Sequence, residues 1–212
     1  MLRKRSISNS ASEERLEKLI EERLLPGADK ENIDKRIWDL FGEKWCVMFT
    51  DLSGFSRGVE KFGIIHFLQT IYEAERLLIP VIEGHDGILL KVEGDSLLVI
   101  FRNVAKGISS AVEMQRILSD YNSDKPGEEQ VLLCVGLGYG EVLRIGDADV
   151  FGTEVNAASK LGEDAAKARE ILVTDSVKEA MGCDGAYSFE QIEDLIPGTK
   201  AAYRLVYHFS VD

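Results

Sequence analysis

The first 43 residues place apolar side chains at the 3.6-residue period of amphipathic helices. A capping box, Ser10-x-x-Glu13, precedes the first apolar stripe, and Pro26-Gly27 follows it. A second helix is predicted to begin at Asp29, with its inner face at three positions: Ile33, Ile37 and Leu40. Residues 1–9 are predicted to be disordered. Both stripes must bury against the main domain, a partner subunit or a regulatory partner, and the sequence leaves these alternatives open.

From residue 44 onward, short strand-like apolar runs alternate with longer helical runs. The predicted elements are strand 45–50, helix 64–81, hairpin 87–101, helix 103–118, strand 131–136, helix 153–165, strand 171–173, a helix capped by Asp175 or Ser176, and weaker strands near 186–190 and 201–209. The β-α-β-β-α-β order is the ferredoxin-like split pattern, so the predicted class is α/β (α+β). We therefore expect an N-terminal helical extension, 1–43, and a main domain, 44–212.

The predicted hairpin carries charged residues at its tip, Lys91-Val-Glu-Gly-Asp95. Gly94 can adopt the positive φ that a tight turn requires. One interpretation is an ordinary polar turn, because charged residues are common where strands meet water. The other is a functional tip, which a second acidic turn upstream favours.

The upstream turn, Asp51-Leu-Ser-Gly-Phe-Ser56, follows an apolar strand and precedes a helix. Its backbone N–H groups can cradle phosphate, and a carboxylate beside them can hold Mg²⁺. In a β-α-β-β order, Asp51 and Asp95 can be neighbours at strand ends. Two such carboxylates suit a pair of metal ions that activate a hydroxyl and stabilise a leaving phosphate. The structural alternative for Asp51 is a helix N-cap.

Composition narrows the range of partners. The chain has 212 residues, a formal net charge of −12 and a pI of about 4.8. Nucleic acid is not expected as a partner, because like charge opposes its approach. Three cysteines, Cys46, Cys134 and Cys183, form no close pair, which favours a reducing cytoplasm. Apolar runs fall short of the roughly 18–20 residues of a membrane-spanning helix, so none is expected.

A glycine-rich run, Gly136-Leu-Gly-Tyr-Gly140, resembles a phosphate loop in composition. It lies at a strand end and not ahead of a helix. Close packing of another element against the strand is therefore the favoured interpretation.

Four blocks, in the order of the predicted elements, resemble the catalytic domain of class III nucleotidyl cyclases. They are Phe49-Thr-Asp-Leu-Ser-Gly-Phe55, Lys91-Val-Glu-Gly-Asp95, Gly136-Leu-Gly-Tyr-Gly-Glu-Val142 and Asp149-Val-Phe-Gly-Thr-Glu-Val-Asn-Ala-Ala-Ser159. The resemblance runs from about Lys44 to Tyr207. It implies the ferredoxin-like core of that family with extra C-terminal strands.

The resemblance implies how metal and phosphate are held. Asp51 and Asp95 match the two metal-binding aspartates, which implies two Mg²⁺ or Mn²⁺ ions per site. The backbone N–H groups of Phe55 and Ser56 would contact phosphate. Arg144 is a further candidate for phosphate binding.

The resemblance also implies how the substrate is chosen. Lys91 would donate to N1 of adenine, and Asp149 would accept from its 6-amino group, so the pair favours ATP over GTP. Asn156 matches the asparagine that orients the ribose and the transition state. Family sites form between two domains, which implies a head-to-tail homodimer with two equivalent sites.

One position departs from the family pattern, which places an arginine four residues after the asparagine. Lys160 keeps the charge but lacks the planar fork of arginine, and a misfitting cation costs on the order of 10²–10³ in rate. The implied activity is adenylate cyclase, forming 3′,5′-cyclic AMP and pyrophosphate from ATP. The alternative is a cyclase-homology module that binds nucleotide, turns over little and acts through a partner.

Overall fold

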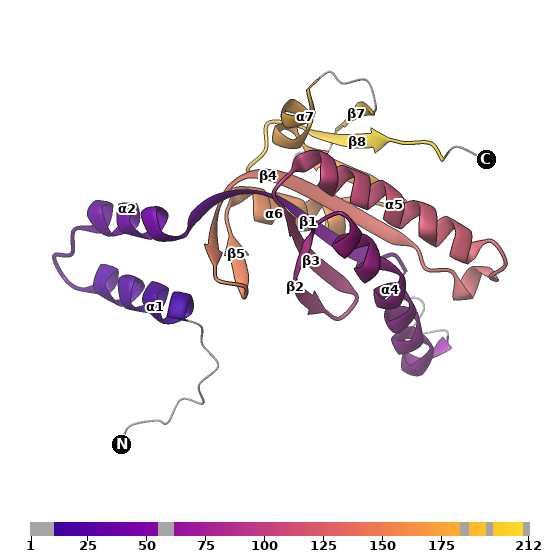
Figure 1. Ribbon diagram of the computed structural model, residues 1–212, viewed down its shortest axis with the longest axis horizontal. Helices are drawn as coiled ribbons and strands as arrows, with labels where there is room; N and C mark the ends of the chain where they lie inside the picture. Colours follow the sequence, from indigo (N-terminus) through magenta and orange to yellow (C-terminus); the bar gives the residue numbers. More distant parts are fainter. Residues whose placement is uncertain (1–10, 55–61, 183–186, 194–196, 210–212) are drawn as a thin grey trace.

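The computed structural model describes residues 11–54, 62–182, 187–193 and 197–209, and element labels follow Figure 1. The helices are α1 (Ala11–Leu24), α2 (Lys30–Phe41), α4 (Ile64–Gly84), α5 (Val104–Asn122), α6 (Thr153–Ser159) and α7 (Asp175–Met181), with a 3-10 turn at Gly127–Glu129 and a π-helix at Lys160–Ala165. The strands are β1 (Gly42–Leu52), β2 (Ile88–Glu93), β3 (Ser96–Phe101), β4 (Leu133–Ile145), β5 (Asp149–Phe151), β6 (Ile171–Thr174), β7 (Ser188–Ile192) and β8 (Ala202–Val206).

One sheet organises the domain, with strand order β2-β3-β1-β4-β6-β8-β7 and β5 paired to β4. β1 pairs with β3 and with β4 in antiparallel fashion, and β4 pairs with β6 in parallel. The first four strands and the helices α4 and α5 form the β-α-β-β-α-β core, which confirms the predicted fold class. The extra C-terminal strands β6, β8 and β7 extend the same sheet.

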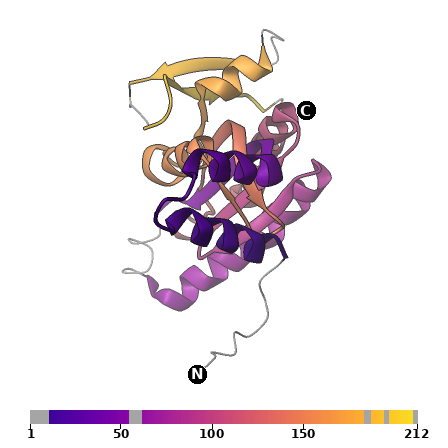
Figure 2. The ribbon, with the colours of Figure 1, turned by 90° about the vertical axis from the view of Figure 1, so that its left-hand side faces the viewer.

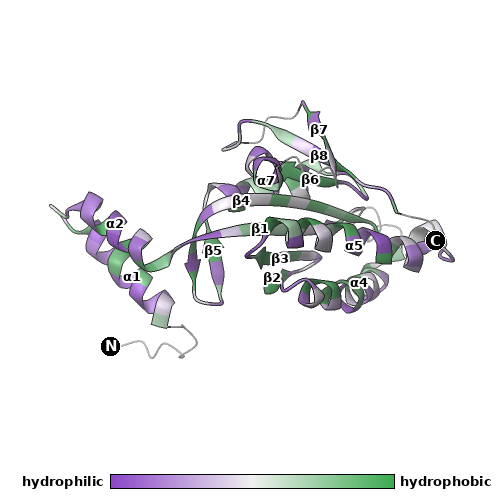
Figure 3. Cartoon of the chain, turned by 45° about the horizontal axis from the view of Figure 1, so that its top comes forward, coloured by the Kyte–Doolittle hydropathy of each residue, from purple (hydrophilic) through white to green (hydrophobic). Residues whose placement is uncertain are grey.

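The two faces of the sheet have different cover. Alternate residues of β1 point to opposite sides, so Cys46 and Met48 pack under α4 and α5, whereas Trp45 and Val47 face α6 and β5. Figures 1 and 3 show α4 and α5 lying together along one face of the sheet. The opposite face has lighter cover, since α6 has only seven residues and β5 three. This second face carries the candidate site.

The N-terminal helices form an antiparallel pair at one end of the molecule, where β1 and β4 extend beyond the rest of the sheet (Figures 1 and 2). Their apolar stripes bury against each other and against Ile145 of β4. An ion pair of 2.5 Å between Arg23 and Asp34 joins the two helices. Of the three alternatives left open by the sequence, burial against the chain's own domain therefore accounts for the inner stripes.

The expected inner face of α2 is partly wrong. Leu40 is 55% exposed, and Phe41 is buried in its place. The buried ridge of α2 follows every fourth residue, Ile33, Ile37 and Phe41. This ridge packs against β4 as the chain turns directly into β1.

Three further expectations need correction. Ile64 and Leu68 have the apolar helical spacing that predicts helix 64–81 and a buried face, but both are exposed, and the buried residues of α4 lie mainly in its later turns. The N-cap of α7 is Thr174, so neither Asp175 nor Ser176 is the cap. The expected helix 153–165 is α-helical only to Ser159 and continues as a π-helix. None of the helices in the described ranges is long and apolar enough to cross a bilayer.

Candidate active site

The hairpin tip adopts the predicted tight turn. Glu93 pairs with Ser96 across β2 and β3, which leaves Gly94 and Asp95 in the turn. Gly94 has a φ of +63°, a conformation that glycine adopts without a steric penalty. β3 then pairs with β1 so that Leu97 lies opposite Thr50, the residue before Asp51. The register therefore brings the tip to the end of β1.

Asp51 and Asp95, here called the carboxylate pair, meet at this end of the sheet. The Ser96 hydroxyl donates to Oδ1 of Asp51 at 3.3 Å, a contact that favours the ionised carboxylate. Burial and the nearby Asp95 raise the pKa of Asp51 to about 6. Burial also raises the pKa of Asp95. Two partly buried carboxylates at the same end of the sheet suit a divalent cation.

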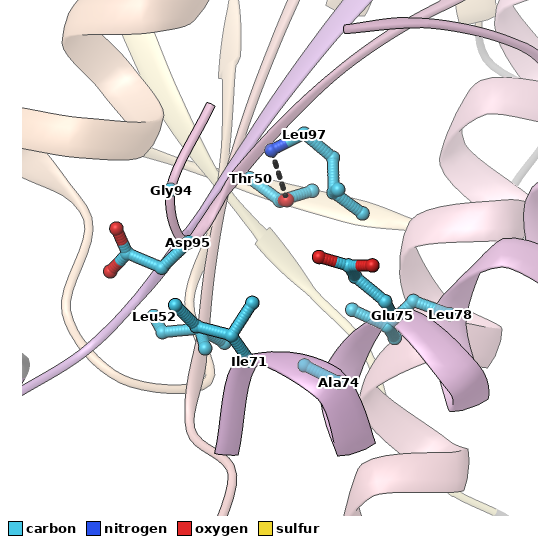
Figure 4. Close-up of a pocket in the computed structure, with 9 residues that line it drawn as sticks. All are labelled: Thr50, Leu52, Ile71, Ala74, Glu75, Leu78, Gly94, Asp95 and Leu97. Carbon is cyan, nitrogen blue, oxygen red and sulfur yellow. Dashed lines mark hydrogen bonds between the residues drawn. The ribbon is translucent and has the colours of Figure 1, made fainter. Parts of the chain in front are cut away.

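The surroundings of Asp95 are shown in Figure 4. Its carboxyl group turns away from the apolar side chains of Leu52 and Ile71, while Glu75 of α4 points toward the small cavity behind the tip. That cavity holds about 10 Å³, room for roughly one water. A nucleotide would therefore lie on the open side of the carboxylate pair and not within this cavity.

The metal-binding capacity of a single chain is limited. Across the described ranges, no three His, Cys, Asp or Glu side chains converge on one point. Asp51 and Asp95 could supply two oxygen ligands, and Mg²⁺ takes its remaining ligands from substrate phosphates and water in sites of this kind. These two ligands suit a metal site in which the substrate supplies further ligands.

Lys91 and Asp149, which the sequence predicts to read the purine and which are therefore called the purine pair, are in direct contact although 58 positions separate them. Nζ of Lys91 lies 2.5 Å from Oδ2 of Asp149. Glu93 is a weaker neighbour of Lys91 at 3.8 Å, and the backbone N–H of Val150 donates to the other oxygen of Asp149. Asp149 begins β5 and does not lie in the preceding turn. The β4–β5 hairpin thus folds over β2 and brings the two residues together.

Asn156 lies in the middle of α6, and Lys160, four positions later, begins the π-helix that continues it. Both are exposed, and the i, i+4 spacing puts them on one face of the helix. Nζ of Lys160 lies 3.8 Å from a carboxylate oxygen of Asp164. The opposite face of α6 is buried through Val155, Ala157 and Ala158.

Arg144 is engaged far from the carboxylate pair, at the distal end of β4. Its guanidinium donates to the carbonyl of Gly146 at 3.0 Å and to Asp147 at 2.8 Å, and it lies 4.9 Å from the ring of Trp45. Within one chain these contacts place it with the turn that precedes β5. Phe55 and Ser56, the other predicted phosphate contacts, lie outside the described residues.

The glycine-rich run of β4 confirms the packing interpretation. A Cβ at Gly136 would lie 2.1 Å from the carbonyl oxygen of Ala158, and one at Gly138 would lie 2.4 Å from that of Glu154. The strand therefore accepts α6 directly on its backbone. The carboxylate of Glu154 reaches into this contact, and the sequence did not predict a role for this residue. The alternate glycines of β4 were the signal that could have indicated a side chain packed closely against the strand.

Comparison with known proteins agrees with this architecture. The protein-family model of the adenylate and guanylate cyclase catalytic domain matches residues 42–204 of the sequence. A serine/threonine-protein kinase, pkn2, of Myxococcus xanthus is 31% identical over 134 residues, which is 63% of this chain and 16% of that protein. An adenylate cyclase of Streptomyces coelicolor is 29% identical over 154 residues, which is 72% of this chain and 36% of that protein. This chain thus spans well under half of either relative.

The fold also matches a solved structure, an adenylate/guanylate cyclase/hydrolase from Silicibacter pomeroyi. The TM-score is 0.66 at 22% identity, and the match covers 77% of this chain and 96% of that one. At this identity the likeness concerns the fold. Together with the family match over most of its length, it establishes that the chain belongs to the family of adenylate and guanylate cyclase catalytic domains.

Proposed function

We propose that this domain is an adenylate cyclase that converts ATP into 3′,5′-cyclic AMP and pyrophosphate. The observation that carries the proposal is the 2.5 Å contact between Lys91 and Asp149. It sets a cationic donor beside an anionic acceptor, the arrangement that complements N1 and the 6-amino group of adenine. Guanine presents the opposite donor and acceptor pattern at the same edge. The similarity to a Streptomyces protein named adenylate cyclase supports the same substrate.

In the proposed reaction, the ribose 3′-oxygen bonds to the α-phosphorus as the bond to the bridging oxygen of the β-phosphate breaks. The hydroxyl proton passes to water, and pyrophosphate leaves. Asp51 and Asp95 would hold two Mg²⁺ or Mn²⁺ ions, which favour the ionised 3′-oxygen and offset phosphate charge. Asn156 would orient the ribose, and Lys160 would stabilise the charge that develops on the phosphate oxygens.

Each site would be completed by a second copy of the chain in a head-to-tail homodimer. One subunit would supply Asp51 and Asp95, and the other would supply the purine pair with Asn156 and Lys160. The small volume of the cavity beside Asp95 supports this arrangement, because a nucleotide needs walls that this part of a single chain does not supply. The lighter cover on the α6 face leaves room for such a partner.

The test is incubation of the purified chain with ATP or GTP and Mg²⁺ or Mn²⁺, followed by chromatography of the products. We expect cyclic AMP from the wild type and from the control Asp86→Asn, which removes a surface ion pair with Lys106 and tolerates the positive φ at this position. We expect none from Asp51→Ala. A wild type without product, or product that survives Asp51→Ala, would contradict the proposal.

A second candidate is a domain that binds nucleotide but turns over slowly, and Lys160 motivates it. Lysine is a point charge without the bidentate geometry of arginine, and here it also has Asp164 within 3.8 Å. Lys160→Arg should raise turnover about 10-fold to 10²-fold if this position limits the reaction. Tight ATP binding by calorimetry without cyclic AMP formation would favour the second candidate.

A further inference from the structure

Glu154 makes an unusual set of contacts for a residue in the first turn of a short helix. Its Oε2 accepts hydrogen bonds from the backbone N–H of Tyr139 at 3.0 Å and from the hydroxyl of Thr174 at 2.9 Å. Its Oε1 accepts from the hydroxyl of Ser176 at 3.1 Å. These donors belong to β4, β6 and α7. One carboxylate therefore ties α6 to three other elements.

The position of Glu154 coincides with a gap in the sheet. β4 pairs with β6 only from Val135 to Leu137, and β6 ends at Thr174. The N–H of Tyr139 lies beyond this pairing and would lack a strand partner on that side. Oε2 of Glu154 supplies the acceptor instead. A buried N–H without a partner costs about 1–3 kcal/mol, so this contact has a clear physical reason.

The backbone of β4 is shaped around this side chain. A Cβ at Gly138 would lie 3.0 Å from Oε2 of Glu154, and a Cβ at Gly140 would lie 2.8 Å from its Cγ. Two alternate glycines on one face of the strand thus leave the space that the side chain occupies. The glycines and the glutamate form one packing unit.

The helix that Glu154 anchors is short and depends on tertiary contacts for its position. α6 has seven residues, and its N-cap, Gly152, makes no side-chain capping bond. Helices this short are not stable alone, so tertiary contacts decide where they lie. Two positions after Glu154 comes Asn156, and Lys160 follows one turn later.

We propose that Glu154 is a positioning residue: it fixes α6 against β4 and thereby holds Asn156 and Lys160 in place for the reaction. This inference rests on the proposed function, since it assigns these two side chains to the transition state. A shift of about 1 Å in such groups lowers turnover by about 10²-fold, whereas substrate contacts made by other elements persist.

The test compares Glu154→Ala with Glu154→Gln and a control, Glu170→Ala. Glutamine can still accept from Tyr139 and Thr174 and can donate its amide to Ser176. The control also removes a partly buried carboxylate, one that accepts from Arg204 and from the N–H of Lys167, each at 2.9 Å. We expect Glu154→Ala to lower kcat about 10²-fold with KM within about threefold, while Glu154→Gln and Glu170→Ala keep kcat within about threefold.

A second variant keeps the proposal testable if Glu154→Ala does not fold. Thr174→Val keeps the volume of a fully buried side chain and removes one donor to Glu154, so we expect kcat to fall about threefold to 10-fold. If Thr174→Val and any folded Glu154→Ala both keep the kcat of the wild type, the proposal is overturned.

Hydrogen exchange separates this inference from the proposed function. Glu154→Ala should speed amide exchange in residues 153–161 at least 10-fold, and Glu170→Ala should not. If the wild type forms no cyclic nucleotide, the proposed function fails, and the exchange result alone decides whether Glu154 fixes α6. Unchanged exchange in this segment would overturn the positioning role.

Discussion

The carboxylate pair and the purine pair differ in the charges of their two members. Asp51 and Asp95 bring like charges together, and the pKa of each is raised. Lys91 and Asp149 bring opposite charges to 2.5 Å. Without a bound cation, the two ionised carboxylates of the first pair repel each other. The second pair holds its own geometry before any ligand binds.

The difference fits the role that we propose for each pair. A metal ion needs concentrated negative charge, which the free protein can keep only at a cost in stability. A purine edge needs one donor and one acceptor at fixed positions, and an ion pair orients both side chains in advance. In the proposed function, the carboxylate pair thus relies on repulsion that a metal ion relieves, and the purine pair relies on attraction that fixes both side chains in advance.

The largest expected effect comes from removing half of the carboxylate pair. Asp95→Asn should lower turnover of ATP by about 10³-fold, because a metal ion that stabilises phosphoryl transfer contributes several kcal/mol. ATP affinity should fall much less, since the purine pair is intact. Steady-state rates and equilibrium dialysis measure the two effects. Equal losses in rate and affinity would show that Asp95 acts on binding alone.

Breaking the purine pair should instead change the choice of substrate. Lys91→Ala removes a charged donor and leaves Asp149 unpaired, so the preference for ATP over GTP should fall about 10-fold to 10²-fold. The measurement is the ratio of kcat/KM for the two nucleotides. Lys44→Ala is a matched control, because Lys44 lies over the ring of Tyr139, away from this pair. An unchanged ratio in Lys91→Ala would remove Lys91 from base selection.

A smaller effect is expected on stability, and its direction is opposite to the loss of activity. The pKa of Asp51 is about 6 in the folded chain and about 3.9 in an unfolded one, so the folded state holds its proton more tightly. Its contribution to stability is therefore lost as pH rises from about 4 to 6. Asp51→Asn should raise the free energy of unfolding by about 1 kcal/mol at pH 8, after allowance for its partial exposure. At pH 4 the gain should vanish.

Asp86→Asn is the matched control for that measurement. Its partner Lys106 holds the pKa of Asp86 below its usual range, the opposite direction to Asp51. Asparagine also tolerates the positive φ of +56° at this position. We expect no gain at pH 8 from Asp86→Asn. Denaturant unfolding at the two pH values distinguishes the variants, and a loss of stability in Asp51→Asn at pH 8 would refute the electrostatic account.

The smallest effect is a proton released when metal binds. Asp51 must ionise to bind a cation, so titration with Mg²⁺ at pH 6 should release about half a proton per Asp51, and close to none at pH 8. Metal affinity should fall correspondingly as pH drops below 6. Calorimetry in two buffers of different ionisation enthalpy measures the release. Equal release at both pH values would mean that Asp51 is already ionised in the free chain.

Much of the fold was predictable because its signals are local. The spacing of apolar residues, which differs between helices and strands, located the core elements. Gly94 marked the turn that the structure contains. Errors arose where burial depends on which element lies opposite. Leu40 and Ile64 have the right spacing to be buried, but both side chains are exposed, 55% and 51% respectively.

The candidate site was predictable only as a set of residues. Residue type and order suggested Asp51, Asp95, Lys91 and Asp149, and the structure brings these together as two pairs. Arg144 illustrates the limit: only the structure shows its contacts with the β4–β5 turn and Trp45, and its role in phosphate binding stays a prediction. Glu154 illustrates the converse, because its hydrogen bonds come from β4, β6 and α7, which only the tertiary structure brings around it.

The sequence by itself determined the order of elements, the tight turn at Gly94 and the inventory of charged groups, since these depend on neighbours a few positions away. Tertiary structure alone decided that Lys91 meets Asp149, that the pKa of Asp51 rises, and that Glu154 ties α6 to β4. These contacts join residues 15 to 58 positions apart. They depend on strand register and on the path of the β4–β5 hairpin, which no local pattern in the chain encodes.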